Sequence, residues 1–258
     1  MKISILLIAF CFYSGSLFCQ EAVNKTAGNG MKEGKWVSRY PDGTLKYEGT
    51  FQHNKPVGDW RRYHENGKTK ALMNYRSGSD RAFASLFDDE GKLYAKGVFE
   101  GTLRDSTWNF YSGELLVLTE NYNHGKKEGC ATGYNEAGKV IWAKIWKNDL
   151  LDGVAREYFP DGIQRSEITY LEGKRNGPAI FYRENGLKSM EGNFREDLSD
   201  GAWSIFDLEG KLKYQVKYKK GEILDGGKLD TLQINEFKQF DKIKGKIPEP
   251  KMNDSGRP

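Results

Sequence analysis

The sequence predicts an all-β protein: one elongated, twisted antiparallel sheet made of about eight tandem β-hairpin repeats of 24 residues. Two periodic aromatic series carry this prediction, each advancing by 23 or 24 residues at every step. The first series is Tyr40, Tyr63, Phe87, Tyr111, Tyr134, Tyr158, Tyr182 and Phe206, and the second is Phe51, Tyr75, Phe99, Tyr122, Trp146, Tyr170, Phe194 and Tyr218. A fixed period of this length indicates a repeat architecture in which each unit packs mainly against its neighbours.

Each unit contains the pattern of one hairpin. Its central turn places Asp or Asn before Gly, as in Asp42-Gly43 and Asn66-Gly67, and this pair favours a tight hairpin turn because glycine adopts positive φ without a steric penalty. The second strand alternates apolar and polar residues over 45–52, which is typical of a half-buried strand. The loops between units are short and polar, so each hairpin is expected to pair beside the previous one.

The first strand of several units carries two aromatic residues three positions apart, such as Trp60 and Tyr63. In a regular strand these side chains point to opposite faces, unless a bulge changes the alternation. If both faces carry rings, one aromatic row is exposed and offers a binding surface. The alternative is that the rings mainly join neighbouring hairpins. The candidate interaction surface consists of Trp36, Trp60, Tyr63, Trp108, Tyr111 and Trp203.

The N-terminal residues resemble a secretory signal peptide. Residues 1–20 contain a lone Lys2, an apolar run over 3–13 and then smaller residues. The apolar run is shorter than the roughly 20 residues of a membrane-spanning helix, so cleavage is favoured over an uncleaved anchor. Acylation of Cys19 is a further alternative, which the bulky Phe18 disfavours. We therefore expect a secreted, periplasmic or cell-envelope protein, with a linker at 21–30 and the repeat array at 31–221.

The C-terminal segment, 222–258, departs from the repeat. Asp230 and Gln233 fit a helix-capping box, and apolar residues at helical spacing follow, so the sequence predicts a short helix over 229–244. This helix is expected to cap the last hairpin, and docking to a partner is its alternative role. The remaining residues, 247–258, are polar and rich in proline and predict disorder.

Composition and motifs exclude several functions. Lys and Arg number 40 against 36 Asp and Glu, and the two signs alternate along the chain, unlike the concentrated basic charge of a nucleic-acid binder. The three histidines, His53, His64 and His124, fall in different units with no metal-ligand spacing. No nucleophile elbow, phosphate-binding loop or zinc-protease helix is present. The sequence therefore predicts no enzyme, no cofactor and no metal site.

The repeat resembles the MORN repeat, in the variant form found in bacterial proteins of the YwqK-type antitoxin family. The matching stretches are Gly34 to Gly43, Gly58 to Gly67 and Gly201 to Gly210, whereas units five to seven carry Ala131, Ala155 and Ala179 in place of the tryptophan. The resemblance implies a non-catalytic scaffold for protein–protein interaction, with an antitoxin-like or immunity-like role as a narrower form. A binder of membrane lipid or polysaccharide at the cell envelope is the alternative.

Overall fold

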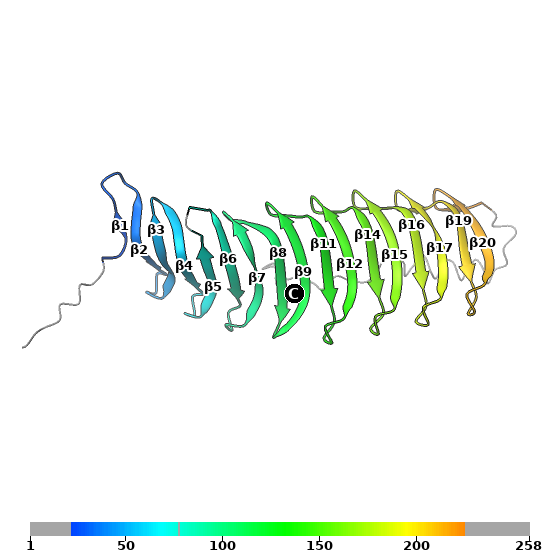
Figure 1. The fold of residues 1–258 in the computed structure, drawn as a ribbon, viewed down its shortest axis with the longest axis horizontal. Coiled ribbons are helices and arrows are strands. Elements are labelled where there is room, and N and C mark those ends of the chain that lie inside the picture. Colours follow the sequence, from blue (N-terminus) through cyan, green and yellow to red (C-terminus); the bar gives the residue numbers. More distant parts are fainter. Residues whose placement is uncertain (1–21, 77, 225–258) are drawn as a thin grey trace, which may run out of the picture.

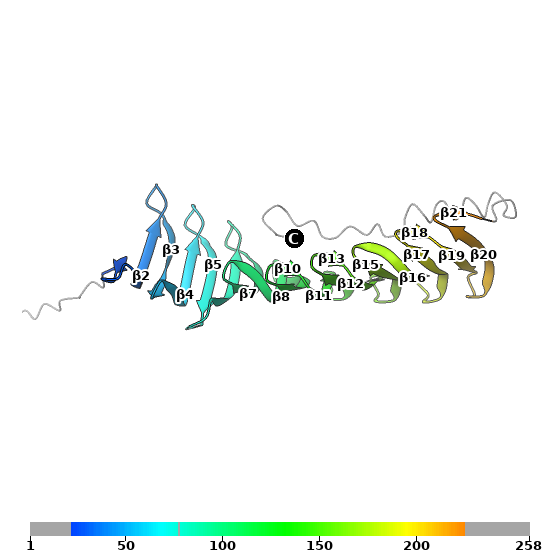
Figure 2. The ribbon, with the colours of Figure 1, turned by 90° about the horizontal axis from the view of Figure 1, so that it is seen from above.

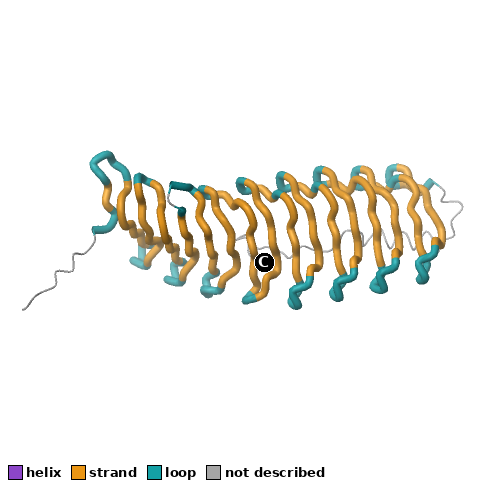
Figure 3. The backbone as a smooth tube through the Cα atoms, viewed as in Figure 1, coloured by secondary structure: helices purple, strands orange, loops and turns teal. Residues whose placement is uncertain are grey.

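The computed structural model describes residues 22–76 and 78–224 and folds them into a 21-stranded antiparallel sheet (Figures 1 and 3). No helix occurs in these two ranges, so none there is long and apolar enough to cross a membrane. The strands are β1 (Lys25–Thr26), β2 (Lys32–Arg39), β3 (Leu45–Gln52), β4 (Lys55–Tyr63), β5 (Thr69–Tyr75), β6 (Arg81–Phe87), β7 (Leu93–Glu100), β8 (Leu103–Ser112), β9 (Leu115–Asn123), β10 (Lys126–Lys127), β11 (Gly129–Tyr134), β12 (Val140–Lys147), β13 (Leu150–Leu151), β14 (Gly153–Tyr158), β15 (Gln164–Leu171), β16 (Lys174–Tyr182), β17 (Lys188–Arg195), β18 (Leu198–Ser199), β19 (Gly201–Phe206), β20 (Leu212–Lys219) and β21 (Glu222–Ile223).

The sheet is an open row of hairpins, which confirms the predicted all-β repeat architecture. The eight hairpins are β2–β3, β4–β5, β6–β7, β8–β9, β11–β12, β14–β15, β16–β17 and β19–β20. They follow one another in chain order along the molecule (Figure 1). The sheet also reaches beyond the expected array, because β1 lies in the segment expected to be a linker and β21 follows Gly221. The expected leader at 1–20 and helix at 229–244 lie outside the described residues.

Every hairpin carries a β-bulge at the same place. The pairing register shifts near the end of the first strand, as before the last residue of β4, between Arg62 and Tyr63, and before the penultimate residue of β8, between Phe110 and Tyr111. All eight hairpins share this shift. A bulge increases the local bend and twist of a strand, and the strands are visibly curved when the sheet is seen from above (Figure 2).

A residue of positive φ stands near the start of most first strands. Gly58 has a φ of 63° and Gly201 a φ of 82°, which glycine adopts without a clash between Cβ and the backbone. Ser106 takes the equivalent place in β8 with a φ of 58°, an unusual conformation for a residue with a side chain. Ala82, at the same place in β6, is not in this region, and β5 and β6 pair without a register shift. The repeat therefore keeps its bend even where glycine is lost, except at β6.

The two faces of the sheet differ in composition. Cross-strand pairing defines one row of side chains on each face. The first row runs through Tyr47, Arg62, Ala71, Leu86, Ala95, Phe110, Leu118, Gly133 and Trp142, and we call its side the tryptophan face. The second row runs through Glu48, Arg61, Leu72, Ser85, Lys96, Asn109, Thr119, Thr132 and Ala143, and we call its side the open face. Most of the buried apolar side chains lie on the tryptophan face.

Three tryptophans fill the space above glycines of the preceding hairpin. Trp60 lies over Gly49, and a Cβ built on that glycine would come within 2.1 Å of the indole ring. The indole Nε1 of Trp60 donates to the carbonyl of Thr50 at 3.1 Å, next to the glycine. The same arrangement recurs for Trp108 over Gly97 with a bond to Val98 and for Trp203 over Gly192 with a bond to Asn193. Each tryptophan thus joins two hairpins by burial and by a hydrogen bond.

The other boundaries between hairpins invert this size pattern. Where the glycine position holds a larger residue, the tryptophan position of the next hairpin holds alanine. The four pairs are Met73 with Ala84, Glu120 with Ala131, Lys144 with Ala155, and Ile168 with Ala179. All seven boundaries in the array therefore pair one small residue with one large residue, and we call this the size rule. It is expected because protein interiors pack at nearly constant density and tolerate little change in volume. This explains the alanines that replace tryptophan in units five to seven.

The buried core is divided into two clusters. One extends from Trp60 to Trp142 and the other from Ile168 to Tyr218. Between them the glycine position is occupied by Lys144, whose Nζ lies 4.9 Å from the centre of the Trp142 ring. The apolar contact between hairpins is therefore interrupted near the middle of the array.

A buried carboxylate lies at the boundary where Ala131 stands. Glu120 is only 2% exposed, and Lys127 Nζ approaches its carboxylate to 2.6 Å. The Tyr122 hydroxyl also donates to Glu120, and Arg104 donates to the Tyr122 oxygen at 3.1 Å. Burial, followed by the nearby Glu120 carboxylate, raises the pKa of Tyr122 well above its usual range. The ion pair and the hydrogen bond thus compensate for burying the charge.

Candidate functional site

Three of the six residues expected to form an aromatic interaction surface are buried. Trp60 is 6% exposed, and Trp108 and Trp203 are fully enclosed in the packing between hairpins. They therefore offer no contact area to a partner, which removes them from the expected surface. Trp36 is half-buried at the N-terminal end of the tryptophan face, where Lys32 Nζ lies 4.7 Å from its ring centre.

The remaining two residues, Tyr63 and Tyr111, lie against side chains of the open face. The Tyr63 hydroxyl donates to Glu48 Oε1 at 2.6 Å, and Lys96 Nζ lies 5.9 Å from the centre of the Tyr111 ring. Burial, followed by the hydrogen bond to Glu48, raises the pKa of Tyr63. The bulge before each tyrosine therefore does not bring it to the tryptophan face, and both faces of the sheet carry rings.

The open face contains a shallow depression above β4 to β8. Its volume is about 610 Å³. A second depression of about 360 Å³ above β2 to β4 shares Asp59 and Arg61 with the first, so the two are adjacent. We call the combined feature the open-face groove. Its open-face side chains are Lys35, Glu48, Thr50, Asp59, Arg61, Leu72, Asn74, Phe83, Ser85, Lys96, Val98, Thr107 and Asn109.

The centre of the open-face groove is apolar and exposed. Phe83 is 55% exposed and Leu72 is 39% exposed, although both come from regular strands. Arg61 pairs directly with Leu72 across β4 and β5, and Lys96 stands on β7 two strands from Leu72. Exposed apolar side chains surrounded by charged ones are the usual anatomy of a protein–protein contact surface.

Local hydrogen bonds fix the polar side chains beside this apolar centre. Asn74 Nδ2 donates to Asp59 Oδ1 at 2.7 Å, which holds both side chains along one edge of the groove. Arg76 places its guanidinium carbon 5.8 Å from the centre of the Phe83 ring.

Sequence reasoning did not identify Leu72 and Phe83, although a signal for each was present. Leu72 interrupts the alternation of β5, since it lies between Ala71 and Met73 where the pattern demands a polar residue. Phe83 lies between two alanines, the first of which, Ala82, replaces the starting glycine of its hairpin. In this sequence, an apolar residue at a position that is usually polar in the repeat therefore predicts the exposed apolar surface better than the periodic aromatic residues do.

Comparison with known protein families agrees with the hairpin periodicity. The model of the MORN repeat variant matches residues 32–53, 56–77 and 199–220, and the model of the MORN repeat matches residues 145–164. The first two matches contain β2–β3 and β4–β5, which form the first half of the open-face groove. No curated protein matches the chain. The eight-hairpin sheet is thus an array that contains MORN repeats, of the variant form near both of its ends and of the MORN form near its middle.

Proposed function

We propose that this protein is a non-catalytic, exported repeat scaffold that binds a protein partner in the open-face groove. The observation that carries the proposal is the exposure of Phe83 and Leu72 in the larger of the two adjacent depressions. An open sheet face of this kind has no packing reason to hold two large apolar side chains. Binding of a partner would remove both side chains from water. The hydrophobic effect would then stabilise the complex by roughly 25 cal/mol for each Å² of apolar surface that becomes buried.

The signal-peptide pattern of residues 1–20 supports export, and the partner is therefore expected in the periplasm, at the cell envelope or outside the cell. The charge of the groove indicates its chemistry. Arg61 and Lys96 flank the apolar centre, whereas Asp59 lies beside Arg61 on β4 and Glu48 pairs with Arg61 from β3. The expected partner surface is an apolar projection with an acidic side. Neutralisation of an exported toxin would be one form of this function.

Site-specific photocrosslinking tests the proposal. A photoreactive residue is placed at Phe83, in the groove, and in a matched control at Leu208, which is 71% exposed on a hairpin turn far along the array. Crosslinking is done in the producing cells, and the adducts are identified by mass spectrometry. We expect one protein adduct from position 83 and none of the same identity from position 208.

A second variant shows whether the adduct depends on the groove. Leu72→Asp in the photocrosslinking protein is expected to remove the adduct and leave the free energy of unfolding within about 0.5 kcal/mol, as for other exposed positions. An adduct that persists in Leu72→Asp, or one formed equally at position 208, would contradict a role for the groove.

A polar band at the C-terminal end of the groove supports a second candidate, binding of envelope polysaccharide. Thr107, Asn109, Thr119 and Asn121 project from β8 and β9 on the open face, and the Thr107 hydroxyl donates to Asn121 Oδ1 at 2.7 Å. Hydroxyl and amide groups offer both donors and acceptors to sugar hydroxyls. Co-sedimentation separates this candidate from lipid binding: the protein should pellet with insoluble glycan and stay in solution with anionic vesicles. Thr119→Val should reduce pelleting.

A further inference from the structure

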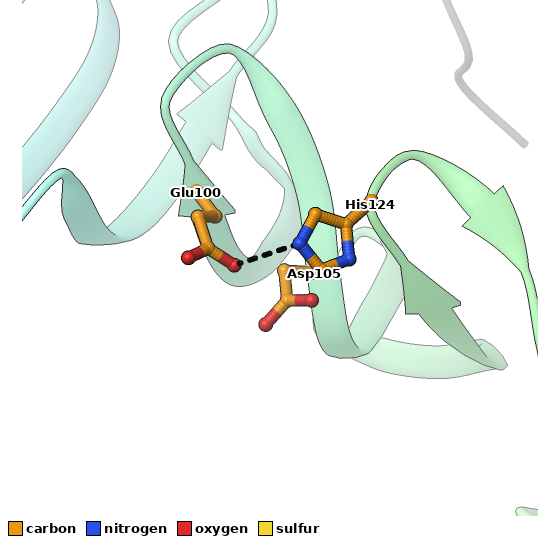
Figure 4. Close-up of side chains that lie close together, drawn as sticks. All are labelled: Glu100, Asp105 and His124. Carbon is orange, nitrogen blue, oxygen red and sulfur yellow. Dashed lines mark ion pairs between the residues drawn. The ribbon is translucent and has the colours of Figure 1, made fainter.

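We propose that Glu100, Asp105 and His124 form a binding site for one divalent transition-metal ion of the Zn²⁺ type. Each residue offers one ligand atom, and these atoms all lie within 4.8 Å of one another. In Figure 4 the Glu100 carboxylate faces the His124 ring, and the Asp105 side chain lies beside this pair. In the part of the chain that the structure describes, no other group of three such residues comes together in this way.

The repeat brings these residues together although the sequence separates them. Glu100 ends β7, Asp105 lies near the start of β8, and His124 follows β9. Glu100 is the last residue of β7, and His124 is the first residue after β9, so they stand next to each other at the ends of the second strands of consecutive hairpins. Asp105 lies on β8, between these two strands. The proposed ion would therefore connect two neighbouring hairpins at one edge of the sheet.

His124 is oriented as a metal ligand. Its Nδ1 lies 2.6 Å from Asn123 Oδ1, and because an amide oxygen can only accept, this contact places the imidazole proton on Nδ1. The lone pair of Nε2 is then available, and Nε2 lies 3.7 Å from Glu100 Oε2. Ligands about 2.1 Å from a tetrahedral zinc ion are about 3.4 Å apart, so side-chain rotation has to bring together ligand atoms that now lie within 4.8 Å of one another. A hydrogen bond that fixes the second nitrogen is the usual support of a ligating histidine.

Asp105 is held in place by groups that leave one of its oxygens free. Its residue is 8% exposed, and its Oδ2 accepts hydrogen bonds from Arg81 Nη2 at 2.8 Å and from the Ser106 hydroxyl at 2.9 Å. Oδ1 therefore remains for a cation. Ser106 makes its bond from a φ of 58°, at a place where Gly58 and Gly201 stand in other hairpins. A serine retained in a conformation that favours glycine indicates that its hydroxyl is needed there.

The ligand set selects the class of ion. One imidazole and two carboxylates suit Zn²⁺ and similar first-row ions, whereas Mg²⁺ and Ca²⁺ prefer ligand shells made entirely of oxygen. The two carboxylates and Arg81 sum to one negative charge, which favours a divalent cation. Three protein ligands leave a fourth tetrahedral position for water.

Calorimetric titration with ZnCl₂ tests the site, using the purified, untagged protein after treatment with a chelator. We expect one Zn²⁺ per chain. His124→Ala and Glu100→Gln are each expected to weaken binding at least tenfold. The visible absorption of Co²⁺, added in place of Zn²⁺, reports the geometry independently, and the tetrahedral spectrum should disappear in His124→Ala.

His53→Ala is the matched control. His53 also lies 3.7 Å from a glutamate, Glu33, but no third ligand joins that pair. Its substitution is expected to leave Zn²⁺ binding unchanged. Absence of saturable binding by the native protein would overturn the proposal. So would equal affinity in His124→Ala, or a loss of affinity in His53→Ala as large as in His124→Ala. Circular dichroism of each variant shows that the sheet is intact, so that a loss of binding is not caused by unfolding.

Discussion

The size rule at the boundaries between hairpins predicts that one natural pair of residues can replace another. At one boundary a small residue, Gly97, lies under a large one, Trp108. At another, the equivalent positions hold a large residue, Ile168, and a small one, Ala179. Gly97→Ile alone should destabilise the protein, because even a Cβ at position 97 would come within 2.3 Å of the Trp108 ring. Trp108→Ala alone should leave a cavity. The double variant should lose less stability than the sum of the two.

The expected magnitudes follow from the packing of Trp108, which is fully buried. Removal of a buried tryptophan side chain costs about 3–5 kcal/mol. Overpacking of a dense site costs about 1–3 kcal/mol. In the double variant the isoleucine at position 97 fills part of the space left by the indole, and the clash disappears. We therefore expect a coupling energy of about 2 kcal/mol between the two positions in the stabilising direction.

Urea unfolding monitored by far-ultraviolet circular dichroism measures the four free energies of this cycle. The control cycle combines Gly97→Ile with Trp203→Ala. Trp203 belongs to the separate second core cluster and packs on its own glycine, Gly192, so its effect should add to that of Gly97→Ile within about 0.5 kcal/mol. Simple additivity of Gly97→Ile and Trp108→Ala would refute the size rule, and so would equal coupling in both cycles.

Three further substitutions test other parts of the array. Lys127→Met leaves the buried Glu120 without its cation and should cost about 3–5 kcal/mol in urea unfolding. The folded state raises the pKa of Tyr122, whereas an unfolded tyrosine ionises near pH 10. Above that pH the unfolded chain loses a proton that the folded chain keeps, so stability falls as the pH rises, and Tyr122→Phe should make this fall less steep in unfolding curves between about pH 9 and 11. Trp36→Ala should cost clearly less than the about 3–5 kcal/mol expected for Trp203→Ala, because Trp36 is only half-buried.

The periodic residues predicted the fold because each one does the same physical task in every unit. Asp42-Gly43 and its equivalents form the hairpin turns, and the alternation in 45–52 places Tyr47 and Phe51 on the packed face. The bulge before Tyr63 was only an open alternative at the sequence level. Its position depends on how the turn closes the hairpin, which no single residue type reveals.

The candidate surface was only partly predictable. Rings at the repeat period suggested a binding surface, but those of Trp60, Trp108 and Trp203 are covered because the preceding glycine leaves space for them. The size rule relates residues eleven positions apart across a boundary, and it becomes visible only when two hairpins are compared. Likewise, Glu100 and His124 match no metal-binding motif, because their approach depends on the stacking of hairpins and not on local spacing.

The packing of each tryptophan on a glycine of the previous hairpin has a practical consequence for anyone who wants to lengthen, shorten or recombine the array. A module cut at the loops between hairpins would separate Gly49 from Trp60 and could join Gly49 to Ala84, which leaves the glycine uncovered. A module cut at the central turns keeps the second strand of one hairpin together with the first strand of the next. The unit that can be exchanged without breaking this packing therefore consists of the second strand of one hairpin and the first strand of the next, and it is offset by half a repeat from the hairpin itself.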